Sequence, residues 1–465
     1  MTDLLVRGGT VVTAGGSRRL DVLVSGGRIE ALLEPEEGER TTASASEVGD
    51  AAGLLVLPGV IDVHTHTRVA SDDEPDRFFQ DTVAAAFGGT TTLFAFNNPK
   101  TGSSDAAERS LVTGMHEWRA VTAGDAAVDI APSLAMSGRA DDPIAEIPAI
   151  VEGGVPTAKA FMVYDFRLDD RRLFHALGAM GRAGGMLEVH CEDPVLIDAG
   201  VAAALARGDT RPRDHAVSRT PAAEAVATHR ALAFAQAADA PIHIVHLSSA
   251  LALSQVRRAK KAGVRVSVET CPHYLTFTSD RYDGTDEEAI RYVISPPLRS
   301  TWDREALWAG LADGTLDLVA TDHVPDRLSV EKRVPAPPFP EISNGAPGVE
   351  TLLAVVYGEG VARGRITVER MVDLLSTTPA RRFGVTGKGA IEPGLDADLV
   401  VFEPGARRTI RATELHHTSD YTPYEGLDVA GAVRSVFVRG RAVVRDGLFV
   451  GQRGYGRFVE RRISA

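Results

Sequence analysis

The sequence predicts an α/β fold: a (β/α)8 TIM barrel with a small β-sandwich domain formed by both ends of the chain. Over residues 58–387, short apolar segments typical of strands alternate with Ala-rich segments whose apolar residues recur at helical spacing. About eight such units imply parallel strands joined by helices, and they suit a closed barrel better than an open sheet. Residues 1–57 and 388–465 have the pattern of short strands joined by Gly-rich turns, so we expect one discontinuous β-rich domain there.

The expected barrel strands can be followed along the chain. The first is the run LLVLPGVIDV, which leads into His64 and His66. The later ones are TTLFAF, VDIAPSLAM, TAKAFMVY, MLEVHC, PIHIVHL, VRVSVET and LDLVATD. Between them, segments such as residues 222–238 and 250–263 place apolar side chains on one helical face, as expected of the helices that cover a barrel.

Composition limits the classes of partner. The chain has 465 residues, 44% of them hydrophobic, and a formal net charge of −13, which argues against nucleic acid and anionic membranes as partners. Neither a signal peptide nor an apolar run of about 18 residues is recognisable, so no membrane segment is expected. The two cysteines, Cys191 and Cys271, are too few for a disulfide framework and fit the reducing cytoplasm.

Ionisable residues stand where the expected strands end. They are His64, His66, Lys159, His190, His246 and Asp322. Side chains at strand C-termini converge on one face of a barrel, and residues i and i+2 of a strand share a side. Imidazole nitrogen and carboxylate oxygen suit Zn, and also Mn, Co, Fe or Ni. Each residue alone is more easily explained as structural, but the set would be costly to bury without a cation.

Lys159 needs a separate explanation, because an ammonium would be repelled by metal cations. A lysine amine kept neutral by desolvation and by neighbouring positive charge can react with carbon dioxide. The product is a carbamate, whose two oxygens can bridge two metals. The alternative is an ordinary interior lysine that is paired with a carboxylate.

At these positions the chain resembles the cyclic amidohydrolases, the group of dihydroorotase, allantoinase, hydantoinase and dihydropyrimidinase. The resemblance covers nearly the whole chain, including the late segment GAIEPGLDADLVVFEP. It implies two divalent ions per subunit, each with its own pair of ligands: His64 with His66, and His190 with His246. N6-carboxylated Lys159 would bridge the ions, and Asp322 would ligate the first ion and shuttle the proton. The reaction implied is hydrolysis of a cyclic amide by a metal-bridging hydroxide.

One set of residues resembles hydantoinases and dihydropyrimidinases. Tyr164 follows Lys159 by five positions, and its hydroxyl would donate to the developing oxyanion. Ser295 in VISPPLR and Asn344 in EISNGAPGVE stand where that subgroup holds the edge of the substrate ring. The segments STTPARRFG, SDYTPYEG and GYGRFV resemble the same subgroup. For Tyr164 alone, a core aromatic is an equal alternative.

A second set resembles dihydroorotases. Arg68 completes an HxHxR pattern and Asn98 lies in AFNNP, and together they would bind a substrate carboxylate. ATDHVPDRLSVEK, with His323, resembles a dihydroorotase segment too, but Asn97 and Asp326 depart from it. For Arg68, a local salt bridge is an equal alternative.

We therefore expect hydrolysis of a hydantoin or dihydropyrimidine ring, with a small cyclic amide or ureide as substrate. The alternatives are a dihydroorotase, in which Arg68 and Asn98 bind the carboxylate, an allantoinase, and a non-catalytic scaffold protein of the dihydropyrimidinase type. The resemblance also implies a homo-oligomer, a tetramer or dimer. The Pro-rich segment 325–345 is expected either to form a lid or to pack statically, and the segment after Arg441 to pack on a neighbouring subunit or form a surface loop.

Overall fold

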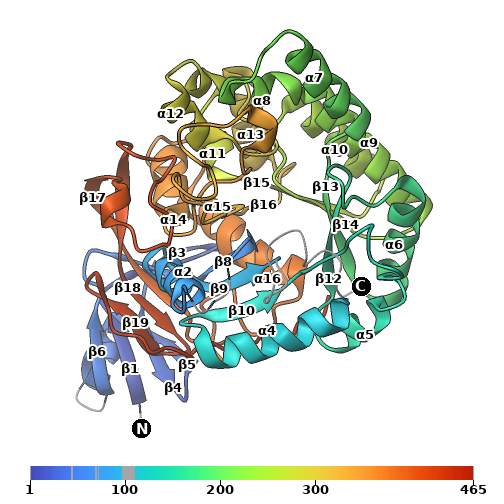
Figure 1. Ribbon diagram of the computed structural model, residues 1–465. Helices are drawn as coiled ribbons and strands as arrows, with labels where there is room; N and C mark the ends of the chain where they lie inside the picture. The colour runs from blue at the N-terminus through green and yellow to red at the C-terminus, as the bar shows by residue number, and fades with distance from the viewer. Residues whose placement is uncertain (1, 43–44, 69–70, 72, 97–109, 464–465) are drawn as a thin grey trace.

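The computed structural model describes residues 2–42, 45–68, 71, 73–96 and 110–463. Its larger part is a barrel of parallel strands (Figure 1). The barrel strands are β8 (Val60–Thr65), β9 (Thr90–Ala95), β10 (Asp129–Pro132) with its continuation β11 (Leu134–Ala135), β12 (Thr157–Phe161), β13 (Met186–His190), β14 (Ile242–Ile244), β15 (Val266–Thr270) and β16 (Leu318–Val319).

Short contacts complete the ring of strands. β10 pairs with β9 and β11 pairs with β12, so one extended segment joins the two sheets of the barrel. On the other side, Thr65 at the end of β8 forms a parallel bridge with His323 after β16. The backbone N–H of Thr321 also donates to Oδ1 of Asp62, at 3.0 Å. The predicted TIM barrel is therefore confirmed.

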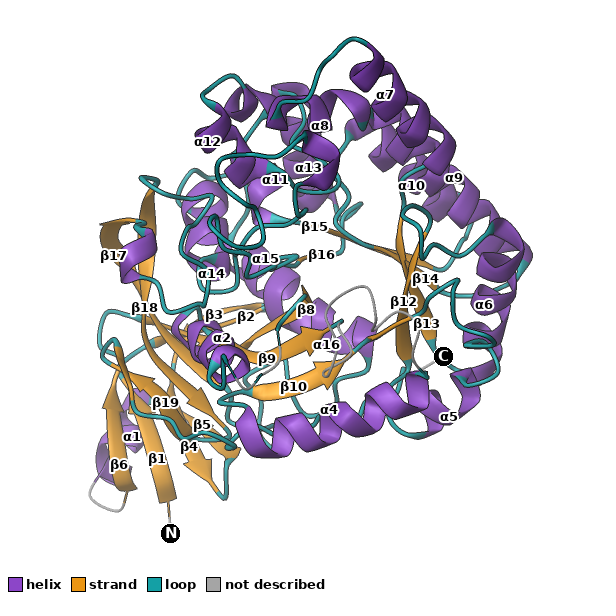
Figure 2. Cartoon of the chain, in the orientation of Figure 1, coloured by secondary structure: helices purple, strands orange, loops and turns teal. Residues whose placement is uncertain are grey.

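Helices alternate with these strands and cover the barrel from outside; Figure 2 shows α4, α5, α6 and α9 along its rim. The main helices are α2 (Arg77–Phe87), α4 (Leu111–Asp125), α5 (Ile147–Glu152), α6 (Asp170–Ala183), α7 (Pro194–Ala206), α8 (Pro212–Ser218), α9 (Pro221–Ala237), α10 (Ala250–Lys261), α11 (Pro272–Thr276), α12 (Asp286–Ala289), α13 (Thr301–Asp313), α14 (Leu352–Val356), α15 (Val368–Val372) and α16 (Thr378–Phe383). Their starts follow from local chemistry. Helix α9, for example, begins with a proline and is capped by the side chain of Thr220. In the described part of the chain, no helix combines the length and apolarity needed to cross a bilayer.

Both ends of the chain build the smaller β domain. Its four-stranded sheet contains β1 (Thr2–Arg7), β4 (Asp21–Ser25), β5 (Arg28–Leu33) and β6 (Ala45–Asp50), with α1 (Pro35–Thr41) beside it. Its seven-stranded sheet contains β2 (Thr10–Thr13), β3 (Gly16–Arg19), β7 (Leu55–Pro58), β17 (Leu399–Thr409), β18 (Asp428–Val438), β19 (Arg441–Arg445) and β20 (Leu448–Phe449). Early strand β7 pairs with late strand β17, so Val56 and Leu399 share one apolar core.

The last described segment returns to the barrel. Val459 donates its backbone N–H to the carbonyl of Ile130, and the N–H of Ile130 donates to the carbonyl of Arg457. Arg461 is completely buried, and its guanidinium donates to the carbonyl of Pro132 and to Oγ1 of Thr157. This segment thus packs on its own barrel, which neither of the two expectations for the tail anticipated.

Candidate metal centre

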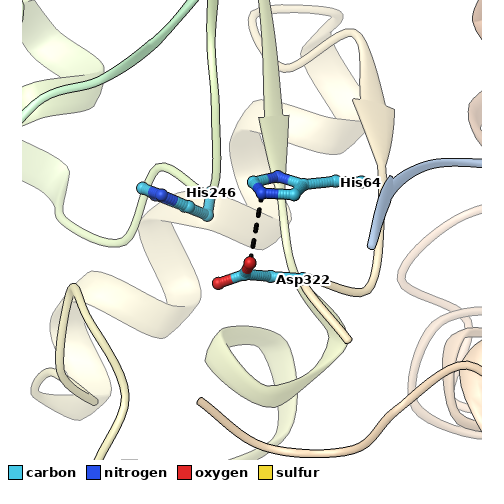
Figure 3. A group of neighbouring side chains, drawn as sticks. All are labelled: His64, His246 and Asp322. Atoms are coloured by element: carbon cyan, nitrogen blue, oxygen red, sulfur yellow. Dashed lines mark ion pairs between the residues drawn. The ribbon is translucent and has the colours of Figure 1, made fainter. Parts of the chain in front are cut away.

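The structure brings all six predicted ligands to one end of the barrel. They come from strands β8, β12 and β13 and from the segments that follow β8, β14 and β16. Ligand atoms of His64, His246 and Asp322 lie within 4.8 Å of one another. Figure 3 shows His64 facing Asp322, with His246 beside them. All three residues are buried.

The remaining predicted ligands adjoin this group. Nε2 of His64 lies 3.1 Å from Oδ1 of Asp322, and Nε2 of His66 lies 3.3 Å from the same oxygen. Nζ of Lys159 lies 3.0 Å from Nε2 of His64. The rings of His190 and His246 are 4.5 Å apart between centroids. The cluster is therefore continuous from His66 to His190.

Two carboxylates orient the histidines. Glu269 accepts a short hydrogen bond from Nδ1 of His64, which leaves Nε2 to face Asp322. Glu192 lies 2.8 Å from Nε2 of His190 and also pairs with Arg219. Carboxylates behind histidines fix the ring tautomer and raise its basicity as a metal ligand.

The donor set fits divalent cations. Nδ1 of His246 is buried and has no hydrogen-bond partner within the described residues, although buried polar atoms are normally satisfied. Burial also holds the pKa of His246 well below its usual range, so its imidazole is neutral, as a metal ligand must be. Imidazole and carboxylate donors in this arrangement suit Zn and related divalent ions.

Lys159 does not behave as an ordinary paired lysine. It is completely buried, and burial lowers the pKa of its amine. Within the described ranges, Nζ of Lys159 forms no ion pair with a carboxylate. The buried Lys388 differs, because its ammonium pairs with Asp129 at 2.9 Å and with Asp398. The alternative of a carboxylate-paired Lys159 is therefore not observed.

Three of the seven non-glycine residues with positive φ among the described residues lie at this site. Tyr164, His246 and Asp322 have positive φ angles of 74°, 38° and 49°. Left-handed backbone in residues with a side chain costs of the order of 1–3 kcal/mol each, and such strain concentrates at functional sites. The backbone strain at these three residues is therefore compatible with a functional site here.

A cavity of about 250 Å³ opens beside the cluster. Its aromatic side is formed by Phe96, Phe161, Tyr164 and Phe166. Ser295 and Asn344 also line it, and Oδ1 of Asn344 is buried without a hydrogen-bond partner in the described chain. The cavity thus combines an aromatic wall with a few polar atoms, as small-molecule sites commonly do.

Arg68 forms a salt bridge within the protein, which was the alternative to binding a substrate carboxylate. Its guanidinium lies 2.8 Å from Oδ1 of Asp326, whose side chain is 0% exposed. Arg68 nevertheless lines the cavity. Asn98, the second predicted carboxylate ligand, lies outside the described residues, as does Asn97.

Several residues of the site were not predicted from the sequence. Glu269 and Glu192 hold the histidines, Arg219 pairs with Glu192, and Asp326 holds Arg68. Glu269 lies near the end of β15, so the strand-end rule that identified the histidines would have found it too. Asp326 gave no such signal, because only the fold brings it beside Arg68.

Comparison with known proteins agrees with this geometry. A model described as the Amidohydrolase family matches residues 219–443. The D-hydantoinase of Streptomyces coelicolor is 38% identical over 98% of this chain and 97% of its own length. The D-hydantoinase of Geobacillus stearothermophilus is 37% identical over 98% of this chain and 96% of its own length. The crystal structure of dihydropyrimidinase from Brevibacillus agri superimposes with a TM-score of 0.92 and 38% identity, covering 100% of both chains.

Proposed function

Since this chain belongs to the amidohydrolase family, in its hydantoinase and dihydropyrimidinase group, we propose that it hydrolyses the C–N bond of a hydantoin or dihydropyrimidine ring. The observation that carries this proposal is the convergence of six candidate ligands beside a cavity lined by Tyr164, Ser295 and Asn344. The ligand cluster also argues against the scaffold alternative, because the residues needed for metal binding are present.

For the metal-binding residues, we propose the division that the family resemblance implies. His64 and His66 would hold one divalent ion, His190 and His246 the other, and carboxylated Lys159 would bridge them. Zn suits these donors best, and Mn, Co, Fe or Ni also fit. When bound at these residues, divalent ions would supply a hydroxide near neutral pH and polarise the amide carbonyl. Carboxylation of Lys159 requires a neutral amine, and burial favours that form.

Asp322 is proposed to move the proton. Burial alone would raise the pKa of its carboxyl, but His64 and His66, which both contact it, hold that pKa well below its usual range. The ionised carboxylate can accept a proton from the attacking water. It can then deliver that proton to the ring nitrogen as the C–N bond breaks.

Three residues are proposed to hold the substrate. Tyr164 would donate its hydroxyl to the oxygen that becomes negatively charged, since its ring lies 5.5 Å from that of His190. The segments of Ser295 and Asn344 line the same cavity and would hold the polar edge of the ring. The stacked pair of Tyr164 and Phe166 leaves an apolar wall for the ring face or its substituent.

The first experiment measures ring opening by the metal-loaded protein on dihydrouracil, hydantoin, neutral and acidic 5-substituted hydantoins, allantoin and dihydroorotate. We expect turnover of hydantoins or dihydrouracil, loss of activity with a chelator, and recovery on adding a divalent ion. The metal content should approach two ions per chain. Turnover of dihydroorotate or allantoin alone would contradict the proposed substrate class.

Arg68 and Asp326 allow a test of whether the site recognises an acidic substituent. Asp326→Asn releases Arg68 from its buried partner, so we expect the KM for an acidic substrate to fall severalfold. Arg68→Met combined with Asp326→Asn removes both charges together and avoids leaving either one buried and unpaired. This double variant should raise the same KM about tenfold, the effect of roughly 1.4 kcal/mol of lost binding.

Neutral substrates are the internal control for that pair of variants. Their KM should change less than twofold in both proteins, because they carry no charge for Arg68 to bind. Equal changes for acidic and neutral substrates would show that the ion pair of Arg68 and Asp326 is only structural.

Two further features belong to the proposal. A homo-oligomer, a tetramer or dimer, is expected from the family resemblance and can be measured by analytical ultracentrifugation. The cytoplasm is proposed as the compartment because both cysteines, Cys191 and Cys271, are buried and unpaired.

A further inference from the structure

Residues 325–345, which follow Asp322, contain a completely buried lysine. Lys332 is 0% exposed. Its ammonium donates to the carbonyl of Val293 at 2.7 Å and to the carbonyl of Ser343 at 2.8 Å. Val293 precedes Ser295 by two residues and Ser343 precedes Asn344 by one, so a single ammonium joins the two segments proposed to hold the substrate ring.

Further hydrogen bonds and apolar packing hold Lys332 and the two segments in place. The backbone N–H of Gly345 also donates to the carbonyl of Val293, at 3.0 Å, so both segments meet at one oxygen. Lys332 is anchored in turn by its own N–H, which donates to the carbonyl of Arg327. Around it, Val293, Phe339 and Ile342 belong to one apolar cluster. In this structure the segment therefore packs against the Val293 segment.

Burying the charged ammonium of Lys332 in these apolar surroundings destabilises the folded protein. Within the described residues, the ammonium of Lys332 forms no ion pair with a carboxylate. Burying an unpaired ammonium costs free energy that an apolar side chain of the same length would not. The two carbonyls would lose their charged donor if the lysine were replaced, and hydrogen bonds to charged groups are among the stronger ones.

We propose that Lys332 is a positioning residue for the substrate. Its ammonium holds the Val293–Ser295 and Ser343–Asn344 segments at the spacing that they need to bind the substrate ring. This proposal rests on the proposed function, because it assigns a purpose to the same cavity. Lys332 does not touch the reacting atoms, so its loss should weaken substrate binding more than it slows the chemical step.

The protonation state of Lys332 makes the KM for the substrate depend on pH. Burial lowers its pKa to about 8, and the nearby charge of Asp326 opposes that shift only in part. The other titratable group facing it is His215 of α8, whose pKa burial and the charge of Arg219 lower to about 3. Between pH 7 and 9, Lys332 therefore changes charge, whereas His215 stays neutral. As the pH rises through about 8, the ammonium is lost and the KM should increase.

That increase cannot come from unfolding linked to Lys332. Its pKa is lower in the folded protein than in the unfolded chain, so the unfolded state binds more protons above pH 8. The contribution of Lys332 to the free energy of unfolding therefore increases with pH, while its contribution to substrate binding decreases.

The test compares Lys332→Met with Arg333→Met, the matched change one position along the same segment. Arg333 is half-exposed and contacts Glu341, away from the cavity. For dihydrouracil, whose ring nitrogens do not ionise in this range, we expect the KM of Lys332→Met to rise at least tenfold, with a smaller change in kcat. Arg333→Met should stay within twofold of the parent protein. Metal content should be equal in all three proteins.

The pH profile and a conservative variant complete the experiment. In the parent protein the KM should rise through pH 8, whereas in Lys332→Met it should be high and flat. Lys332→Gln retains a donor without charge, so an intermediate and pH-independent KM is expected. It also preserves the test if the methionine variant does not fold.

The outcomes separate the two proposals. A parent protein that opens no cyclic amide would contradict the proposed function itself. A parent protein that is active while the folded lysine variants keep its KM and its pH profile would overturn only the role of Lys332. A KM increase shared equally by Arg333→Met would overturn it as well.

Discussion

Asp322→Asn is expected to lower kcat about a thousandfold, because the amide can neither accept nor return the proton that ring opening requires. The amide also removes a charged ligand from the cluster in which Asp322 contacts His64 at 3.1 Å and His66 at 3.3 Å. Steady-state kinetics should therefore be measured together with metal content at saturating metal. A loss of kcat at nearly full metal content would isolate the proton transfer.

The control for this prediction is Asp286→Asn. Asp286 is a surface aspartate that pairs with Arg211 on the outside of the barrel. Exposed ion pairs contribute little to stability, so kcat and metal content should not change. An Asp322→Asn protein with a kcat within tenfold of the parent would assign the proton transfer to another group.

Lys159→Met is expected to abolish both metal binding and turnover. Methionine fills a similar volume but cannot form a carbamate, so the proposed bridging ligand between the two ions would be lost. The buried histidines around it remain, but they are expected to retain metal only weakly. Elemental analysis after gel filtration should find well below two metal ions per chain, and activity should be at the detection limit.

Lys388→Met provides the contrast, because Lys388 is also a buried lysine. It is held by Asp129 and Asp398, so its loss leaves buried Asp398 without its ammonium partner and Asp129 with Arg439 alone. We expect a loss of about 3–5 kcal/mol in the free energy of unfolding, with normal metal content in the protein that remains folded. If both variants lose stability but keep two metals, Lys159 is an ordinary interior lysine and the carbamate is wrong.

Much of the fold and the centre of the site could be predicted from local patterns. The alternation of apolar and Ala-rich segments identified the barrel, because strands and helices have different periods of burial. His64, His190 and Asp322 could be assigned to one site because the C-terminal ends of parallel strands meet. These inferences need only the order of residues along the chain.

The rest depends on contacts between distant segments. Asp326 lies 258 positions from Arg68, and nothing local in either segment predicts their ion pair. Lys332 lies in a Pro-rich segment that suggested a loop, yet its side chain is completely buried between Val293 and Ser343. Arg461 belongs to a tail with no strong pattern. In all three cases the partner is fixed by how the elements pack, which a single sequence does not specify.

The pairing of β7 with β17 has a consequence for biosynthesis. β7 ends at Pro58 and its neighbour begins only at Leu399, so the early strands leave the ribosome long before their partner exists. At translation rates of about 5–20 residues per second, the wait is on the order of tens of seconds. During that time an unpaired apolar edge, including Val56 and Leu57, is open to aggregation or to a chaperone. The yield of folded protein should therefore depend on expression temperature and chaperone supply more strongly than its final stability suggests.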